Sequence, residues 1–225
     1  MRARLWFVLA AGFTVGASAC ADAGADLGGG NDADADTDSD TLNLGNAACL
    51  PENGPFTSDI DHPYLPFDVG SVHKLEGLEG GTEYGCLRIV VPGDTAEVGG
   101  VTARVVEKHG CEDGGVDEPE VEYFAQAPDG TVCIFGEEGG WEAGQGGYEA
   151  GLFMPGAPAV GMVFESIHGP DGVETGEITE LGVPFETPAG TLDDTMTVLE
   201  DGPSLKRYAR NIGEIYDDGL VLVSY

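Results

Sequence analysis

Five cysteines carry the most definite chemistry in this 225-residue sequence. Thiols pair as disulfides in an oxidising compartment, so an odd number leaves one cysteine over. If one of the five is modified, the other four can form two disulfides, each of which stabilises a fold by roughly 2 to 4 kcal/mol. The five are Cys20, Cys49, Cys86, Cys111 and Cys133.

Cys20 follows a segment with the features of a secretory signal peptide. Residues 1–4 carry two positive charges, residues 5–17 form an apolar run, and Ala17-Ser18-Ala19 is a small-residue cleavage site. The apolar run is too short to span a bilayer comfortably. The sequence therefore predicts a signal peptide over residues 1–19 and an exported protein.

The segment Ala17-Ser18-Ala19-Cys20 resembles the lipobox of bacterial lipoproteins, in which the cysteine becomes the acylated first residue of the mature chain. Those proteins usually have Leu at the position of Ala17, so cleavage of the same bond by an ordinary signal peptidase stays open as an alternative. The odd number of cysteines favours lipidation of Cys20. Ala21, rather than Asp, resembles the signal that sorts lipoproteins to the outer membrane. An anchored protein there would face the periplasm or the cell surface.

Residues 20–48 form a predicted acidic, disordered tether. They hold seven Asp and no basic residue, so charge repulsion keeps such a chain extended. Asp32, Asp34 and Asp36 match the first three ligand positions of an EF-hand calcium loop, but Thr and Asn replace the required Gly and the final acidic ligand. We favour a solvated linker over a specific calcium site. We expect no cofactor beyond weak, nonspecific binding of divalent cations.

The remaining chemistry-bearing residues form no recognised catalytic motif. The four histidines lie on separate segments without zinc-site spacing, and no Gly-x-Ser-x-Gly, P-loop or dinucleotide fingerprint occurs. Adjacent acids such as Glu137 and Glu138 could do acid/base work if one were buried with a raised pKa. In a chain this acidic, such pairs are expected from composition. A secreted hydrolase that uses buried carboxylates is therefore the alternative interpretation.

The charge balance excludes two classes of partner. There are 41 Asp and Glu against 9 Lys and Arg, a formal net charge of -32. Proteins that bind nucleic acid, or dock electrostatically on anionic lipid, need clustered basic residues. Residues 49–225 alone hold 34 acidic and 7 basic side chains, a net charge of -27. We interpret this acidity as adaptation to a saline or cation-rich environment.

The sequence pattern indicates that the elements which position the candidate residues are β-strands. Residues 49–225 are long enough for a single domain, and 37 Gly and 13 Pro indicate many turns. No segment has sustained helical apolar spacing, whereas short β-rich runs recur. We predict an all-β fold, an antiparallel meander that forms a single curved sheet, half-barrel or barrel. The predicted strands are 69–78, 82–91, 101–108, 119–127, 131–136, 160–168, 173–180, 183–186, 191–199, 205–209 and 220–225.

Two turns have specific local chemistry. Pro128-Asp129-Gly130 and Pro170-Asp171-Gly172 combine a fixed φ, an Asp that bonds back to the backbone and a Gly that tolerates positive φ. Each lies between two predicted strands, so both predict β-hairpins.

Alternating strand direction also constrains the disulfides. It places Cys86 and Cys111 at one end of the sheet, and Cys133 near the other end, where the chain enters from Cys49. We therefore favour a Cys86–Cys111 and a Cys49–Cys133 pair among the three connectivities that four cysteines allow.

The second half of the chain holds short motifs rich in Gly, Pro and aromatic residues. They are Tyr123-Phe124-Ala125-Gln126, Asp129-Gly130-Thr131-Val132, Phe135-Gly136-Glu137, Gly140-Trp141-Glu142-Ala143-Gly144, Met154-Pro155, Pro158-Ala159-Val160-Gly161, Val183-Pro184 and Thr187-Pro188-Ala189-Gly190-Thr191. This pattern resembles a family of exported bacterial lipoproteins of unknown function. The resemblance implies a β fold and no particular activity.

Four residues near these motifs are candidates for ligand binding. Trp141, Tyr148, Phe153 and Met154 would bind an apolar ligand if they lined the mouth of a curved sheet. The structural interpretation, in which they are core or edge anchors, is the one we favour. Sequence periodicity does not separate the lining of a cavity from the core.

Together these features predict an envelope lipoprotein with a non-enzymatic binding domain. Its expected partner is a hydrophobic ligand or an envelope protein, and lipid-carrying half-barrels offer an analogy at the level of fold alone. The alternatives are the hydrolase described above and a surface interaction module without a pocket. A concave apolar cavity favours binding, and a cleft with two facing carboxylates favours catalysis.

Overall fold

Antiparallel strand pairing organises the structure, a computed structural model that describes residues 42–79, 83–112, 115–201 and 204–225. These residues contain two short 3₁₀ helices, η1 (Asn46–Cys49) and η2 (Pro51–Asn53), and no α-helix. The prediction of an all-β fold is therefore confirmed. The signal peptide, the lipidation site Cys20 and the candidate calcium ligands Asp32, Asp34 and Asp36 lie outside the described residues.

The strands form one large sheet and one small separate hairpin. The hairpin is β2 (Asp61–His62) with β3 (Leu65–Pro66). The first half of the large sheet comprises β1 (Asn43–Leu44), β4 (Val72–Glu79), β5 (Glu83–Val90), β6 (Thr95–Val98), β7 (Val101–Glu112), β8 (Gly115–Val116), β9 (Glu120–Gln126), β10 (Val132–Glu137) and β11 (Trp141–Glu142). The second half comprises β12 (Gly151–Met154), β13 (Val163–Gly169), β14 (Gly172–Thr187), β15 (Gly190–Glu200), β16 (Leu205–Ala209), β17 (Gly213–Asp217) and β18 (Leu220–Ser224).

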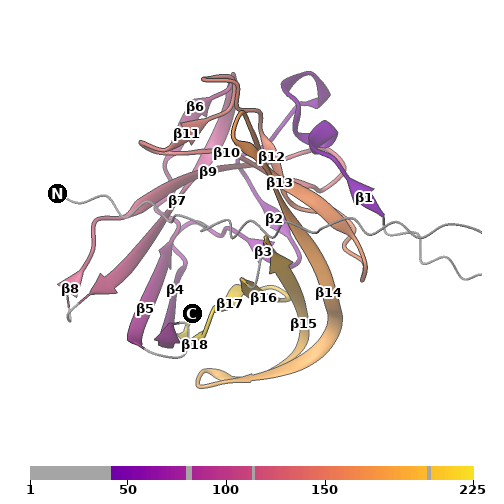
Figure 1. Cartoon of the computed structure of the whole chain (residues 1–225). Helices are drawn as coiled ribbons and strands as arrows, with labels where there is room; N and C mark the ends of the chain where they lie inside the picture. The colour runs from indigo at the N-terminus through magenta and orange to yellow at the C-terminus, as the bar shows by residue number, and fades with distance from the viewer. Residues whose placement is uncertain (1–41, 80–82, 113–114, 202–203) are drawn as a thin grey trace, which may run out of the picture. The chain divides into compact units, whose positions relative to one another are not determined.

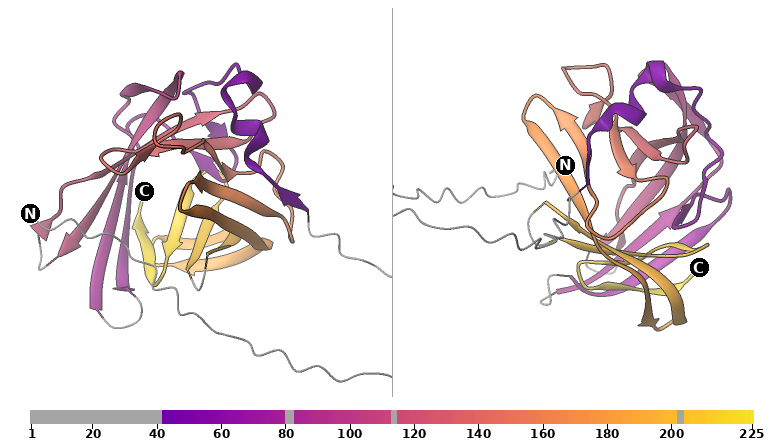
Figure 2. Two further views of the ribbon diagram at one scale, coloured as in Figure 1. Left: turned by 45° about the horizontal axis from the view of Figure 1, so that its top comes forward. Right: turned by 90° about the vertical axis from the view of Figure 1, so that its right-hand side faces the viewer.

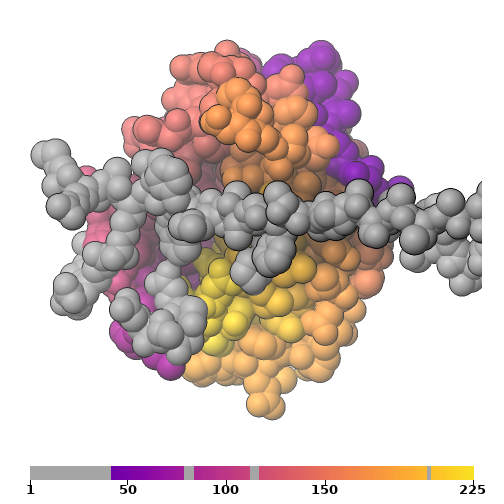
Figure 3. Space-filling view, in the orientation of Figure 1, coloured from indigo at the N-terminus to yellow at the C-terminus, as the bar shows by residue number. Residues whose placement is uncertain are grey.

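The large sheet follows the order β1-β13-β14-β15-β16-β17-β18-β4-β5-β7-β9-β10-β11, with β6, β8 and β12 attached to it. It curves strongly (Figures 1 and 2) but does not close into a barrel. β14 and β15 form a long curved hairpin, whose side chains cover the lower part of the face shown in Figure 3.

The meander departs from neighbour order at several places, two of which join strands that are distant in the sequence. The last strand, β18, pairs with β4, and β1 pairs with β13 in parallel, so that Asn43 lies opposite Val163. Our prediction of antiparallel pairing in neighbour order was wrong for the parallel β1–β13 pair, and the antiparallel β18–β4 pair joins strands that are not neighbours in the sequence. The β18–β4 pair matters most, because it places the C-terminal strands β16, β17 and β18 beside β4 and β5.

Individual strands also differ from the prediction. β14 is one strand where two were expected, because Gly182 and Pro184 lie at register shifts that the β14–β15 ladder absorbs. Strands β6, β12 and β17 were not predicted. The folded unit begins before residue 49, since Asn46, which we assigned to the tether, is buried and donates hydrogen bonds to Glu149 Oε2 and Ala150 O. That burial moves the end of the predicted tether toward the N-terminus.

Both predicted hairpins are present. Between β9 and β10, Gly130 has φ +90 and Asp129 Oδ1 accepts a hydrogen bond from Thr131 N at 3.0 Å. Between β13 and β14, Gly169 lies opposite Gly172, so that only Pro170 and Asp171 form the turn. The Pro-Asp-Gly motif therefore fixes the register of each strand pair.

The segment of residues 49–56 contacts one face of β10. Cys49 forms a disulfide with Cys133, and the rings of Phe56 and Phe135 meet edge to face at 5.3 Å. A second disulfide joins Cys86 on β5 to Cys111 on β7. These are the two pairs that the alternation of strand direction favoured. The strand β10 is consequently buried on both faces.

The other face of β9 and β10 belongs to the inside of the curve. Phe124 on β9, Ile89 on β5 and Glu214 on β17 all line one pocket, although β17 and β5 are separated by two strands. Side chains from strands so far apart can meet only on the concave side of a curved sheet. Residues 58–67, which include β2 and β3 and which we call the plug segment, also reach this pocket.

Candidate functional site

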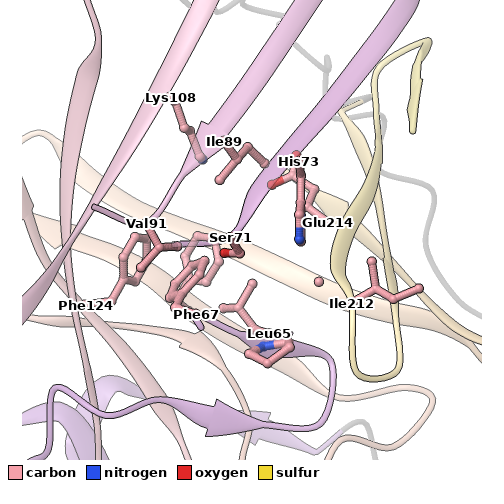
Figure 4. Close-up of a pocket in the computed structure, with 13 residues that line it drawn as sticks. Leu65, Phe67, Ser71, His73, Ile89, Val91, Lys108, Phe124, Ile212 and Glu214 are labelled. Atoms are coloured by element: carbon pink, nitrogen blue, oxygen red, sulfur yellow. The ribbon is translucent and has the colours of Figure 1, made fainter. Parts of the chain in front are cut away.

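The pocket under the plug segment is lined mainly by apolar side chains. Its polar lining consists of Ser71, His73, Lys108 and Glu214. Figure 4 shows Phe67, Val91 and Phe124 on one side, and His73 with Glu214 on another. The apolar lining comprises Leu65, Pro66, Phe67, Ile89, Val91, Phe124, Phe153 and Ile212. As closed here, the pocket has a volume of about 10 Å³, which is barely enough for one water molecule.

Glu214 is the most unusual residue of this lining. Glu214 is 4% exposed, and its Oε1 atom has no hydrogen-bond partner among the described residues. It lies on β17 directly opposite Tyr208 of β16. Burial, which the neighbouring lysines do not fully offset, raises the pKa of Glu214 to about 7. A buried polar atom without a partner is rare in folded proteins and calls for a specific explanation.

Glu214 belongs to a group of six charged side chains inside the sheet, which we call the interior charge cluster. Two lysines and four carboxylates form it: Lys108, Glu122, Glu200, Lys206, Glu214 and Asp217. Residues 49–225 contain only three lysines, and two of them are here. Because this chain has so few basic residues, the placement of two lysines in one cluster indicates that they compensate the charge of its carboxylates.

Both lysines of the cluster already have carboxylate partners. Lys108 Nζ lies 3.0 Å from Glu122 Oε2, and Lys206 Nζ lies 3.5 Å from Glu200 Oε2. Burial alone would lower the pKa of each lysine, but the surrounding carboxylates outweigh it and raise both. The Oε2 atom of Glu122 lacks hydrogen-bond geometry, but the ion pair at 3.0 Å compensates its charge. Glu214 lines the pocket, and its Oε1 atom is buried without a hydrogen-bond partner among the described residues.

The polar lining does not form a hydrolytic triad. No side-chain hydrogen bond joins Ser71, His73 and Glu214 in the described part of the chain. Burial lowers the pKa of His73, so this imidazole is neutral near pH 7. Among the described residues that line the pocket, Glu214 is also the only acid. A pair of facing carboxylates, as acid/base hydrolysis requires, is therefore not formed at this pocket.

The plug segment closes the pocket through a dense set of polar contacts. Tyr64, 2% exposed, donates from its hydroxyl to Asp194 Oδ1 at 2.6 Å and accepts from Arg210 Nη2 at 3.1 Å. The Arg210 guanidinium also pairs with Asp194 and lies 4.7 Å from the centre of the Tyr64 ring. Asp61 and the Gln126 amide exchange two hydrogen bonds of 2.9 Å. The plug is thus held to β9, β15 and the β16–β17 turn.

His62 completes the plug and its contacts fix its tautomer. Tyr64 N donates to His62 Nδ1 at 3.2 Å, so the ring proton must be on Nε2, which donates to Pro155 O at 3.1 Å. Burial lowers the pKa of His62, with a smaller contribution from Arg210. The neutral ring therefore satisfies both neighbours.

The four predicted ligand-binding residues do not come together. Phe153 is half-buried and lines the pocket under the plug, where it contacts Phe124 edge to face at 5.0 Å. Met154 is fully buried in the core and lines neither pocket. Successive residues of a strand point to opposite sides, which separates these two.

Trp141 and Tyr148 lie at a different place, a shallow surface hollow of about 390 Å³. Their ring centres are 5.6 Å apart, so the two rings contact each other while both line this hollow. Glu137, Glu142 and Gln145 form the polar rim of this hollow. Burial raises the pKa of Glu137, and repulsion from Glu120 and Glu122 adds to it.

Sequence reasoning missed the polar residues of the pocket. Lys108 follows Arg104 and Val106 at alternate positions of one predicted strand, which is a signal for a shared face. Glu214 gave no such signal, because β17 was not predicted as a strand. Its burial depends on pairing between β16, β17 and β18.

The described residues contain no group of three or more His, Cys, Asp or Glu side chains placed to hold a metal ion. In the same part of the chain, no helix has the length and apolar character needed to cross a membrane.

Comparison with known proteins adds no name to this site. No family model, no curated protein and no solved structure matches the chain. The family resemblance of the second half of the sequence therefore stays a prediction. What the chain does must be argued from its own residues.

Proposed function

We propose that this protein is an exported, lipid-anchored bacterial protein whose β unit binds a small hydrophobic ligand inside the curved sheet, without catalysing a reaction. The observation that carries the proposal is the pocket under the plug segment. It combines apolar walls from four strands and the adjoining loops with a few polar groups, which is the usual composition of a small-molecule site. A ligand must displace half-buried lining side chains such as Phe67 and Phe153 to enter.

The anchor rests on sequence signals alone. The lipobox-like segment before Cys20 and the odd cysteine number support lipidation, because the other four cysteines are paired as disulfides. The acidic tether would hold the unit away from an outer-membrane surface. An envelope protein as the partner, in place of a small ligand, is the alternative, and it would use an exposed surface rather than the pocket.

Catalysis by buried carboxylates is less well supported. Glu214 has the raised pKa that a general acid or base needs. The pocket has no second carboxylate among its described lining residues, and its imidazole makes no hydrogen bond to Ser71 or Glu214. Binding therefore accounts for more of the arrangement than hydrolysis does.

The proposal is tested by native mass spectrometry of protein purified gently from its own membrane fraction, with and without reducing agent. We expect a diacyl or triacyl mass on Cys20, two disulfides and a co-purifying small molecule. Ile212→Trp, which fills the pocket from a half-buried lining position, should remove that molecule. Val183→Trp, at an exposed position on β14, is the matched control and should retain it.

Two results would overturn the proposal. An unmodified N-terminus with no bound molecule would remove both the anchor and the ligand. A co-purifying molecule that Ile212→Trp retains as fully as Val183→Trp would place binding elsewhere on the protein.

A further inference from the structure

The unpaired carboxylate oxygen of Glu214 indicates the chemistry of the ligand, if the pocket binds one as proposed. A buried acceptor without a donor costs about 1 to 3 kcal/mol. Glu214 Oε1 is such an acceptor and belongs to a residue that lines the pocket. A hydrogen-bond donor on the ligand would remove this cost, whereas a purely apolar ligand would leave Glu214 Oε1 without a donor.

The charges around Glu214 indicate which kind of donor fits. With all six members ionised, the interior charge cluster has a net charge of -2, from two lysines and four carboxylates. Lys108 is paired with Glu122 and Lys206 with Glu200. The charge of each ammonium is therefore already compensated by a carboxylate. The field at the unpaired oxygen favours a cation, and the net charge of -27 on residues 49–225 acts in the same direction.

The walls of the pocket are compatible with a buried ammonium group. The rings of Phe67, Phe124 and Phe153 line the apolar part, and aromatic faces attract cations as well as apolar groups. An ion pair between a ligand ammonium and a carboxylate is also a charge-assisted hydrogen bond, roughly twice as strong as a neutral one.

We propose that the ligand is an apolar molecule bearing a basic amine, and that Glu214 receives its ammonium group. This inference rests on the proposed function, because it assigns the chemistry of the ligand to the same pocket. The apolar body would lie against Phe67, Val91 and Phe124, and the ammonium would donate to Glu214 Oε1.

The protonation of Glu214 supports this assignment. The groups that face it are Tyr208 and Lys206 from β16, Asp217 from β17, Glu200 from β15, Lys108 from β7 and His73 from β4. Burial raises the pKa of Glu214 to about 7, so a share of the molecules is protonated at neutral pH. An ammonium ligand binds the ionised form, so its affinity should rise between pH 6 and pH 8. A carboxylate ligand would show the opposite trend.

Four probes with the same aromatic body test the inference: toluene, benzyl alcohol, benzylamine and benzoate. Their binding to the full chain is measured at pH 8 by ligand-observed NMR titration. We expect benzylamine to bind about tenfold more tightly than toluene, since a charge-assisted hydrogen bond is added. Benzoate should bind more weakly than toluene. Glu214→Gln should abolish the preference for benzylamine.

The matched control is Glu186→Gln, the same change of charge at an exposed position on β14. It should keep the preference for benzylamine, which separates a contact with Glu214 from a general effect of net charge. Circular dichroism of each variant confirms that it is folded.

The possible outcomes distinguish the two proposals. If all four probes bind equally, the pocket binds apolar ligands and the amine inference is overturned. Preferential binding of benzoate, or a preference for benzylamine that survives Glu214→Gln, overturns it as well. If none of the probes binds, the proposed function fails together with the inference.

Discussion

The plug segment and the β16–β17 hairpin both place polar and charged side chains against the curved sheet, but these groups have partners at the plug, and one buried oxygen has none at the hairpin. At the plug, Tyr64, Asp194 and Arg210 satisfy one another through hydrogen bonds, an ion pair and a stacked guanidinium. At the hairpin, Glu214 is 4% exposed, close to the 2% of Tyr64, and one of its oxygens has no donor among the described residues. The two regions meet at the turn that carries Arg210.

This difference separates a structural role from a functional one. A fully satisfied polar network rigidifies a fold and leaves nothing for a ligand to bind. An unsatisfied buried group destabilises the fold, and such groups concentrate where a protein binds or reacts. We therefore expect substitutions at the plug to lower stability, and the removal of the Glu214 charge to raise it.

The largest effect should come from Tyr64. Tyr64→Ala removes a ring that is 2% exposed, together with its hydrogen bonds to Asp194 and Arg210, and should lower the free energy of unfolding by about 4 kcal/mol. Tyr64→Phe keeps the ring and should cost only about 1 kcal/mol. Urea denaturation of the oxidised protein measures both. Equal losses in the two variants would show that the ring itself contributes little.

For Glu214 we expect the opposite effect, a higher free energy of unfolding when its charge is removed. Its pKa is raised from 4.5 to about 7 on folding, so the unfolded chain releases this proton at lower pH than the folded chain does. Stability is therefore lost as pH rises from 4.5 to 7, and the loss is complete above pH 7. At pH 8, Glu214→Gln should raise the free energy of unfolding by an amount on the order of 3 kcal/mol.

At pH 5 the gain from Glu214→Gln should shrink to less than about 1 kcal/mol, because the folded state then holds the proton. Denaturation at the two pH values, with Glu186→Gln as the control for net charge, gives the comparison. A gain that is the same at both pH values would contradict a perturbed, buried carboxylate at this position.

How far the sequence anticipates these two regions depends on how local their determinants are. The hairpins at Pro128-Asp129-Gly130 and Pro170-Asp171-Gly172 are encoded by the turn residues themselves, and both form as predicted. The turn before β17 is different, because Asn211 adopts φ +62 and Gly213 φ +109 without forming a recognisable dipeptide motif. β17 was missed for that reason, and Glu214 with it.

The residues of the site could not be predicted from short segments of the sequence. Met154 and Phe153 are neighbours with the same apolar character, and only the sheet decides that one is core and the other lines the pocket. Lys108 sits at an inward position of β7, and its partner Glu122 comes from β9, 14 residues later. Pairing of β18 with β4 brings both halves of the interior charge cluster together, and no short segment encodes it.

The smallest expected effect concerns the acid side of the pH profile. Burial lowers the pKa of His62 below 6.5, so protonation of this ring favours the unfolded chain. Its contribution to stability is complete above pH 6.5 and is lost as pH falls toward the folded pKa, with a slope of at most about 1.4 kcal/mol per pH unit. Protonation would also set an Nδ1 proton against Tyr64 N, which now donates to that atom.

This effect is best measured in a Glu214→Gln background, which removes the opposing slope between pH 4.5 and 7. His62→Gln keeps a donor near Pro155 O but cannot gain a charge, so stability should fall less steeply below pH 6.5 than in the parent. The difference between the two denaturation curves isolates the ring from the many surface acids that titrate in both. Parallel curves down to pH 5 would mean that His62 takes up its proton over the same pH range in the folded and the unfolded chain, so that folding does not lower its pKa. The plug would then be as insensitive to pH as its satisfied hydrogen bonds suggest, and the whole pH response of the interior would belong to Glu214 and the cluster around it.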